Sequence, residues 1–100
     1  MSPAAEPPAE TEEPTSDFVR VLGQRLRAAR EGKKPKRWSL ERLGRRSRVH
    51  WMYIGEIERG EVNPSVLVLA RIAHALDLDL GELMAGLPAP PPGKDPDADE

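Results

Sequence analysis

Three arginines within four residues give this chain a concentrated positive charge. Arg45, Arg46 and Arg48 come directly before an apolar segment that contains Trp51 and Met52. Guanidinium groups bind phosphate through charge-assisted hydrogen bonds, so a cluster of this kind favours a polyanionic partner. A solvated basic surface is the simpler alternative. The density of the cluster beside this segment favours phosphate contact.

The charge of the chain is unevenly distributed. The formal net charge is −2 at pH 7, yet residues 18–87 carry fourteen Lys and Arg against eight Asp and Glu. Residues 1–17 carry five acidic residues and no basic one, and residues 88–100 carry Lys94 and four acidic residues. A basic central segment is typical of proteins that bind nucleic acid. The acidic ends are interpreted as solvated tails, with competition against DNA for the basic surface as the alternative.

Residues that could support catalysis or bind a metal are sparse. His50 and His74, 24 positions apart, are the only histidines, and there is no Cys to complete a zinc site. The glycines are scattered singly rather than gathered in a phosphate-binding loop. We therefore predict no enzyme activity, no metal and no cofactor. The absence of Cys fits a reducing cytoplasm, and no apolar run reaches the roughly 20 residues of a membrane span, so we expect a soluble cytoplasmic protein.

Apolar residues confine the folded unit to the middle of the chain. Apart from Met1, every Val, Leu, Ile, Met and Phe lies within residues 18–87. This segment is long enough for one small domain with a modest core. We expect residues 1–17 and 88–100 to be disordered, acidic, Pro-rich tails.

Apolar spacing and capping residues predict five helices in this domain, which is therefore all-α. On the fourth helix, Val66, Leu69, Ile72, Ala73 and Leu76 are expected to face inward. A glycine after the third helix is expected to adopt the left-handed conformation. The residues predicted to begin or end helices are Asp17, Gly32, Pro35, Ser39, His50, Gly60, Pro64, Ser65 and Asp79.

A short motif makes this arrangement more specific. Residues 54–65 read IxxIERGxxNPS, and a turn at Ser47-Arg48-Val49 separates the helix in which they begin from the helix before it. Two short helices joined by a tight turn are the layout of helix-turn-helix DNA-binding domains. From about Phe18 to Leu87 the chain resembles the XRE family of lambda-repressor and Cro-like regulators. The resemblance implies a compact five-helix domain that binds double-stranded DNA and regulates transcription.

The resemblance also implies which residues contact DNA. The third helix of such domains lies in the major groove, and its outward positions correspond to Trp51, Met52 and Glu56. Helical periodicity agrees, because Ile54 and Ile57 share the opposite face. The family usually has Gln, Arg, Ser or Thr at the outward positions, and peripheral packing is the alternative for Trp51. Contacts with the DNA backbone are expected from Arg45, Arg46, Arg48, His50, Arg59 and Asn63.

The same resemblance implies an ion pair, and the short reach of a single reading helix predicts a dimer. Arg30, late in the first helix, is expected to pair with Glu58 of the motif. One reading helix covers few base pairs, so two copies on a palindromic operator are expected. The residues expected at the dimer interface are Leu80, Met84 and Leu87, with Leu67 or Val68 nearby.

Three questions stay open at the level of sequence. A controller protein of a restriction-modification system is an alternative within the same class, suggested by its compact length. An antitoxin or another protein-interaction module is an alternative from a different class, in which the tails or the pair Trp51 and Met52 bind a protein. The basic loop at residues 32–37 is either a further arm for the DNA backbone or only a solvated loop.

Overall fold

The computed structural model describes residues 16–90, 92–93 and 97, and these residues form five helices and no strand. The all-α, five-helix architecture predicted from the sequence is confirmed. Most of the two predicted tails lies outside the described residues. The helices are α1 (Asp17–Glu31), α2 (Leu40–Ser47), α3 (Trp51–Glu58), α4 (Val66–Ala75) and α5 (Leu80–Met84).

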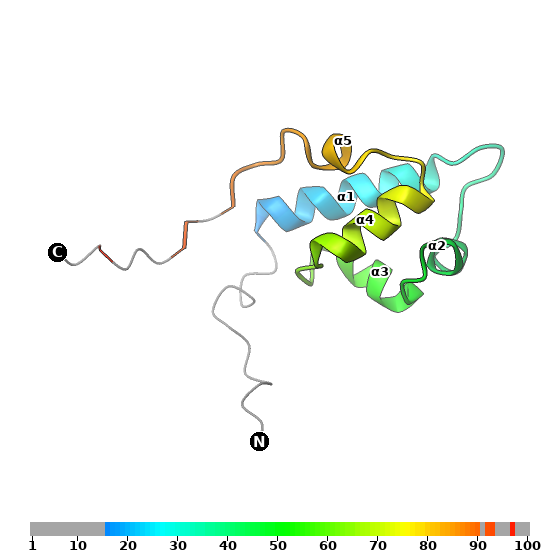
Figure 1. Ribbon diagram of the computed structural model, residues 1–100, viewed down its shortest axis with the longest axis horizontal. Coiled ribbons are helices and arrows are strands. Elements are labelled where there is room, and N and C mark those ends of the chain that lie inside the picture. Colours follow the sequence, from blue (N-terminus) through cyan, green and yellow to red (C-terminus); the bar gives the residue numbers. More distant parts are fainter. Residues whose placement is uncertain (1–15, 91, 94–96, 98–100) are drawn as a thin grey trace, which may run out of the picture.

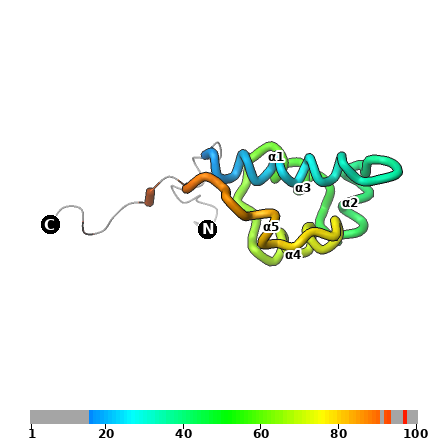
Figure 2. Tube along the Cα trace, turned by 90° about the horizontal axis from the view of Figure 1, so that it is seen from above, coloured from blue at the N-terminus to red at the C-terminus, as the bar shows by residue number. Residues whose placement is uncertain are grey.

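The short helices α2 and α3 lie against a frame made by the other helices. α3 packs against both α1 and α2, whereas α4 packs against α2 and α5. After α5 the chain runs back along α1 toward the first residues of that helix (Figures 1 and 2). Arg25 of α1 holds this return, because its guanidinium donates hydrogen bonds to the carbonyl oxygens of Leu83, at 2.9 Å, and Ala85. α3 is thus held by contacts with both α1 and α2.

The core is apolar and draws on all five helices. Its centre is formed by side chains of α1, α2, α3 and α4 that have almost no exposed surface. Burying one such side chain contributes roughly 1.5–3 kcal/mol to folding. No described helix combines the length and the apolar character that crossing a membrane requires. The buried apolar residues are Val19, Leu22, Leu26, Trp38, Leu43, Val49, Ile54, Ile57, Leu69, Ile72, Ala73, Leu76 and Leu83.

Side-chain caps begin four of the helices. Ser39 and Ser65 each accept a hydrogen bond from the backbone N–H three residues later, and Asp79 accepts one from the N–H two residues later. α1 differs from the prediction, because Ser16 is its N-cap residue and Asp17 lies in its first turn. There the carboxylate of Asp17 is favoured by the positive end of the helix dipole and accepts a hydrogen bond from Arg20 at 2.7 Å.

A glycine ends α3, as predicted. Gly60 has a φ of 73°, and its N–H donates to the carbonyl oxygen of Ile57 at 3.0 Å. The N–H of Glu61 donates to the carbonyl oxygen of Glu56, also at 3.0 Å. This pair of bonds around a left-handed residue is the Schellman arrangement, which satisfies carbonyls left free at the helix end. The left-handed conformation predicted for Gly60 is confirmed.

The start of α4 departs from the prediction. Val66 was expected to face inward, yet 68% of its surface is exposed, and 61% of that of Leu67 is exposed. Val66 is the first residue of α4, and helical side chains point toward the N-terminus of their helix. The side chain of Val66 therefore projects past the end of α4 instead of over the core. Burial on this helix is concentrated one turn later, at Leu69, Ile72 and Ala73.

Candidate nucleic-acid interface

A tight turn joins α2 to α3. Ser47 belongs to α2, and Arg48 ends that helix in the left-handed region, with a φ of 61°. The N–H of Arg48 donates to the carbonyl oxygen of Gly44 at 2.8 Å, and the next residue, Val49, is buried in the core. A residue with a Cβ pays roughly 1–2 kcal/mol in this conformation. The left-handed conformation of Arg48 and the burial of Val49 thus set the angle between the two helices.

A small residue lets α2 and α3 approach closely. A Cβ added to Gly44 would lie 3.2 Å from both the Cβ and the backbone N of Trp51, and 3.0 Å from the carbonyl oxygen of Val49. These distances are at the tight end of atomic contact. At Gly44, therefore, the backbone of α2 lies directly against the first residue of α3. The first residue of α3 is held directly against α2.

The N-terminal end of α3 carries a histidine cap and two exposed apolar side chains. Nδ1 of His50 accepts a hydrogen bond from the backbone N–H of Met52 at 3.1 Å, so His50 caps the helix. The imidazole stacks on the indole of Trp51, with 6.0 Å between ring centroids. Trp51 is 42% exposed and Met52 is 56% exposed. The end of this helix is therefore both ordered and apolar.

The two faces of α3 have different surroundings. Ile54 and Ile57 are fully buried in the core beside α1 and α2. Met52 is exposed and Glu56, one turn later on the same face, is half-buried. The face that carries Met52 and Glu56 is thus the one available to a partner.

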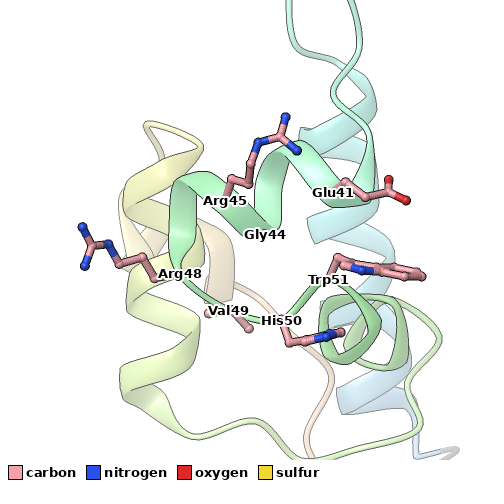
Figure 3. A pocket seen from close by; sticks show the side chains of 7 residues that line it. All are labelled: Glu41, Gly44, Arg45, Arg48, Val49, His50 and Trp51. Atoms are coloured by element: carbon pink, nitrogen blue, oxygen red, sulfur yellow. The ribbon is translucent and has the colours of Figure 1, made fainter.

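An open groove of about 420 Å³ lies between α2 and the start of α3. Figure 3 shows Glu41 and Trp51 extending to the same side of the groove, with Arg48 on the opposite side and Arg45 pointing away from α3. Of the predicted phosphate ligands, the groove brings together Arg45, Arg48 and His50. The residues that line it are Glu41, Gly44, Arg45, Arg48, Val49, His50 and Trp51.

Arg46 lies apart from this groove, on a tryptophan that the sequence analysis did not identify. Trp38 is buried, and the guanidinium carbons of Arg42 and Arg46 lie 4.9 and 5.3 Å from its ring centroid. Nζ of Lys33 lies 4.7 Å from the same ring and 3.6 Å from a carboxylate oxygen of Asp77. Cations are attracted to the face of an indole, so Trp38 gathers three of them. In the sequence, the only indication of this cluster is a single Trp directly after a run of basic residues.

Arg30 and Glu58 join α1 to the end of α3. Nε and Nη2 of Arg30 donate to the two carboxylate oxygens of Glu58 at 2.8 and 2.9 Å. Nη1 of Arg30 donates to the carbonyl oxygen of Trp38 at 2.8 Å. Both side chains are buried, and the hydrogen bonds with Glu58 raise the pKa of the Arg30 guanidinium above its ordinary value. The network fixes α3 against α1 and against the segment that leads into α2.

Comparison with known proteins decides the family. A family model described as helix-turn-helix matches residues 26–83, which is more than half of the chain and includes α2, the turn and α3. The chain belongs to this helix-turn-helix family. The predicted membership of the XRE group of regulators is confirmed.

Solved structures of transcription regulators resemble this helix-turn-helix protein. A restriction-modification controller protein from Aeromonas hydrophila is 37% identical, with a TM-score of 0.60, over 65% of this chain and 94% of that one. The clp gene regulator of Corynebacterium glutamicum is 33% identical, with a TM-score of 0.59, over 66% and 82%. A hypothetical transcription factor from Neisseria is 28% identical, with a TM-score of 0.61, over 75% and 78%. No curated protein matches the sequence significantly. The helix-turn-helix protein is a DNA-binding transcription regulator.

Two predicted backbone contacts of the helix-turn-helix domain lie beyond α3. Arg59 is exposed, and its Nε donates to a carboxylate oxygen of Glu61 at 2.8 Å. This bond raises the pKa of Arg59 and lowers the pKa of Glu61. Asn63 is exposed in the connection between α3 and α4. Arg59 and Asn63 are thus both on the surface, and the guanidinium of Arg59 is already bonded to the carboxylate of Glu61.

The residues predicted at a dimer interface are less exposed than the start of α4. Leu80, Met84 and Leu87 are half-buried and pack against the core of the helix-turn-helix domain. Among the described residues outside α3, the large exposed apolar side chains are Val66 and Leu67. Among the described residues, no group of three or more His, Cys, Asp or Glu is arranged to hold a metal ion.

Proposed function

We propose that this regulator inserts α3 into the major groove, with Trp51, Met52 and Glu56 toward the base edges. The observation that carries this proposal is the contrast within α3, because Met52 is exposed while Ile54 and Ile57 are buried. An α-helix fits the major groove, where each base pair presents its own pattern of polar and apolar groups. The residues proposed to contact the DNA backbone are Arg45, Arg46, Arg48, His50, Arg59 and Asn63.

The experiment that tests this proposal is selection of bound duplexes from a random pool by the full-length chain. Enrichment of one sequence supports specific binding and supplies the site for every later measurement. Equal recovery of all sequences, with binding that depends only on salt, contradicts it. We infer that the chain acts by binding and not by catalysis, because the matched family and the similar structures are regulators. We propose a cytoplasmic location, because the similar regulators come from bacteria, whose chromosome lies in the cytoplasm.

We further propose that two copies bind a palindromic operator. One reading helix covers only a few base pairs, and two half-sites about 34 Å apart place two reading helices on one side of the duplex. The proposed interface includes Leu80, Met84 and Leu87, with the exposed Leu67 of α4 as a further apolar candidate. Sedimentation velocity of the free protein and of its DNA complex tests this. A dimer that Met84→Glu or Leu67→Glu dissociates supports the proposal, and a monomer in both samples contradicts it.

A narrower candidate is control of a restriction-modification system. It is favoured by the controller protein from Aeromonas hydrophila, of which 94% is covered at 37% identity. The test is to map bound sequences on the chromosome of the source organism. Sites upstream of restriction and modification genes support this role. Sites confined to other genes assign the protein to a different regulatory task.

A further inference from the structure

We propose that Trp51 and Met52 read thymine methyl groups, so that the operator contains thymines at the positions facing the start of α3. This inference rests on the proposed function, in which α3 enters the major groove. It specifies the base that the apolar part of the reading surface recognises. Trp51 and Met52 are the large exposed apolar side chains of α3, at 42% and 56% exposure.

The first argument comes from the chemistry of base edges. In the major groove, adenine, guanine and cytosine present nitrogen and oxygen donors or acceptors, whereas thymine adds an apolar C5-methyl group. The thioether of Met52 offers no strong donor or acceptor, and the indole of Trp51 offers a single N–H. Side chains of this kind cannot form the paired hydrogen bonds that arginine or glutamine makes with a purine. Contact with a methyl group is the interaction that their surfaces support.

The second argument is that Trp51 is held in place before DNA binds. Its Cβ and backbone N face Gly44 so closely that an added Cβ would lie 3.2 Å from each. Its ring stacks on His50 with 6.0 Å between the ring centroids, and Nδ1 of His50 accepts a hydrogen bond from the N–H of Met52. An apolar side chain fixed by packing loses little conformational freedom on binding. A preset indole therefore suits a contact that requires shape instead of a hydrogen bond.

The third argument is the charge beside this apolar end. Arg45 and Arg48 line the groove next to Trp51. Both arginines are exposed and extend away from the indole, so they are available to DNA phosphates near the bases that α3 faces. A purely apolar protein partner would have no use for cations in this position. The combination favours DNA as the occupant.

The test uses the full-length chain and the duplex that it selects. Deoxyuridine replaces thymidine at one position at a time, which removes the C5-methyl group and leaves every hydrogen-bonding group of the base unchanged. We expect one or two positions at which the substitution weakens binding about fourfold, the factor that corresponds to one buried methyl group. The same substitutions are then measured with Trp51→Ala, Met52→Ala and, as a control away from the methyl contact, Arg45→Ala.

The variants separate a methyl contact from a general effect on the duplex. At the position that its missing side chain contacted, Trp51→Ala or Met52→Ala should bind the thymidine and deoxyuridine duplexes with equal affinity. Arg45→Ala should keep the fourfold difference in affinity between the two duplexes. Circular dichroism checks that each variant is folded. If a variant is unfolded, the affinity of the wild-type protein for the deoxyuridine duplexes decides the test by itself. Unchanged wild-type affinity at every deoxyuridine position overturns this inference but not the proposed function, because α3 can still contact other groups of the bases in the major groove. Selection of no sequence at all overturns the proposed function and this inference together.

Discussion

Arg30 and Glu58 form two hydrogen bonds with each other across 28 positions of the chain. The bonds connect α1 to the last residue of α3, so the reading helix is fixed at its C-terminal end as well as through the turn. The same guanidinium binds the carbonyl oxygen of Trp38, which precedes α2. One buried side chain thus holds both helices of the helix-turn-helix in their relative positions.

Arg30→Ala should lower the free energy of unfolding by about 3–5 kcal/mol, because it leaves the buried carboxylate of Glu58 without its partner. Arg27→Ala is the matched control, since Arg27 bonds Glu31 on the exposed surface of the same helix. It should cost less than about 1 kcal/mol. Urea denaturation of both variants gives the comparison. If both variants lose the same small amount of unfolding free energy, the bond between Arg30 and Glu58 does not stabilise the fold.

Arg48→Gly should make the protein more stable while weakening its binding to DNA. Glycine adopts the left-handed conformation of residue 48 without steric cost, which is worth about 1 kcal/mol, while the variant lacks a cation beside the groove. Arg45→Gly, inside α2, should instead destabilise by about 1 kcal/mol. Thermal unfolding and DNA titration of the two variants are the measurements. If Arg48→Gly is less stable than wild type, the left-handed conformation of Arg48 does not strain the turn.

The salt dependence of binding tests the proposed phosphate contacts. The slope of log affinity against log salt should flatten by about 0.9 for each contact removed, in Arg45→Ala, Arg46→Ala and Arg48→Ala. Base preference should stay almost unchanged in all three, because phosphate contacts carry no sequence information. Arg20→Ala, an exposed charge on α1, is the control of equal charge. If all four variants share the wild-type slope, the contacts lie elsewhere.

The bond between Arg59 and Glu61 predicts a pH effect with a definite sign. Since this bond lowers the pKa of Glu61 in the folded protein, it stabilises the fold above the unfolded pKa of that carboxyl. The contribution is lost as pH falls through the lowered value, and it is small because both groups are exposed. NMR titration of the side-chain carboxyl should show a higher pKa of Glu61 in Arg59→Ala. The pKa of Glu31, which Arg27 lowers, should stay the same.

Features set by neighbouring residues could be predicted from the sequence. Gly60 follows a short helical pattern directly, and the caps at Ser39 and Ser65 lie within three residues of the N–H groups they bind. Their chemistry is local, so the pattern of residue types was sufficient. The resemblance to XRE regulators supplied the expected partner of Arg30, which no local pattern contains.

Features set by the packing of distant segments could not be predicted in the same way. Trp38 lies in a loop without periodicity, and its contacts come from the end of α1 through Arg30 and from α2 through Arg42 and Arg46. Val66 has the right spacing for the core, but its position at the first residue of α4 exposes it. Leu80, Met84 and Leu87 are half-buried against the core because α5 packs on α1 and α4, and their spacing in the sequence does not indicate this contact.

The central claim is that the outward face of α3 reads DNA sequence. Its most direct test is the affinity of wild type, Met52→Ala and Glu56→Ala for every single-base variant of the selected site. Each variant should stay within about 0.5 kcal/mol of wild-type stability and lose preference at one or two positions. Ile54→Ala, on the buried face, should instead lose roughly 2–5 kcal/mol of stability. Identical base preferences in wild type and both outward variants would contradict the account.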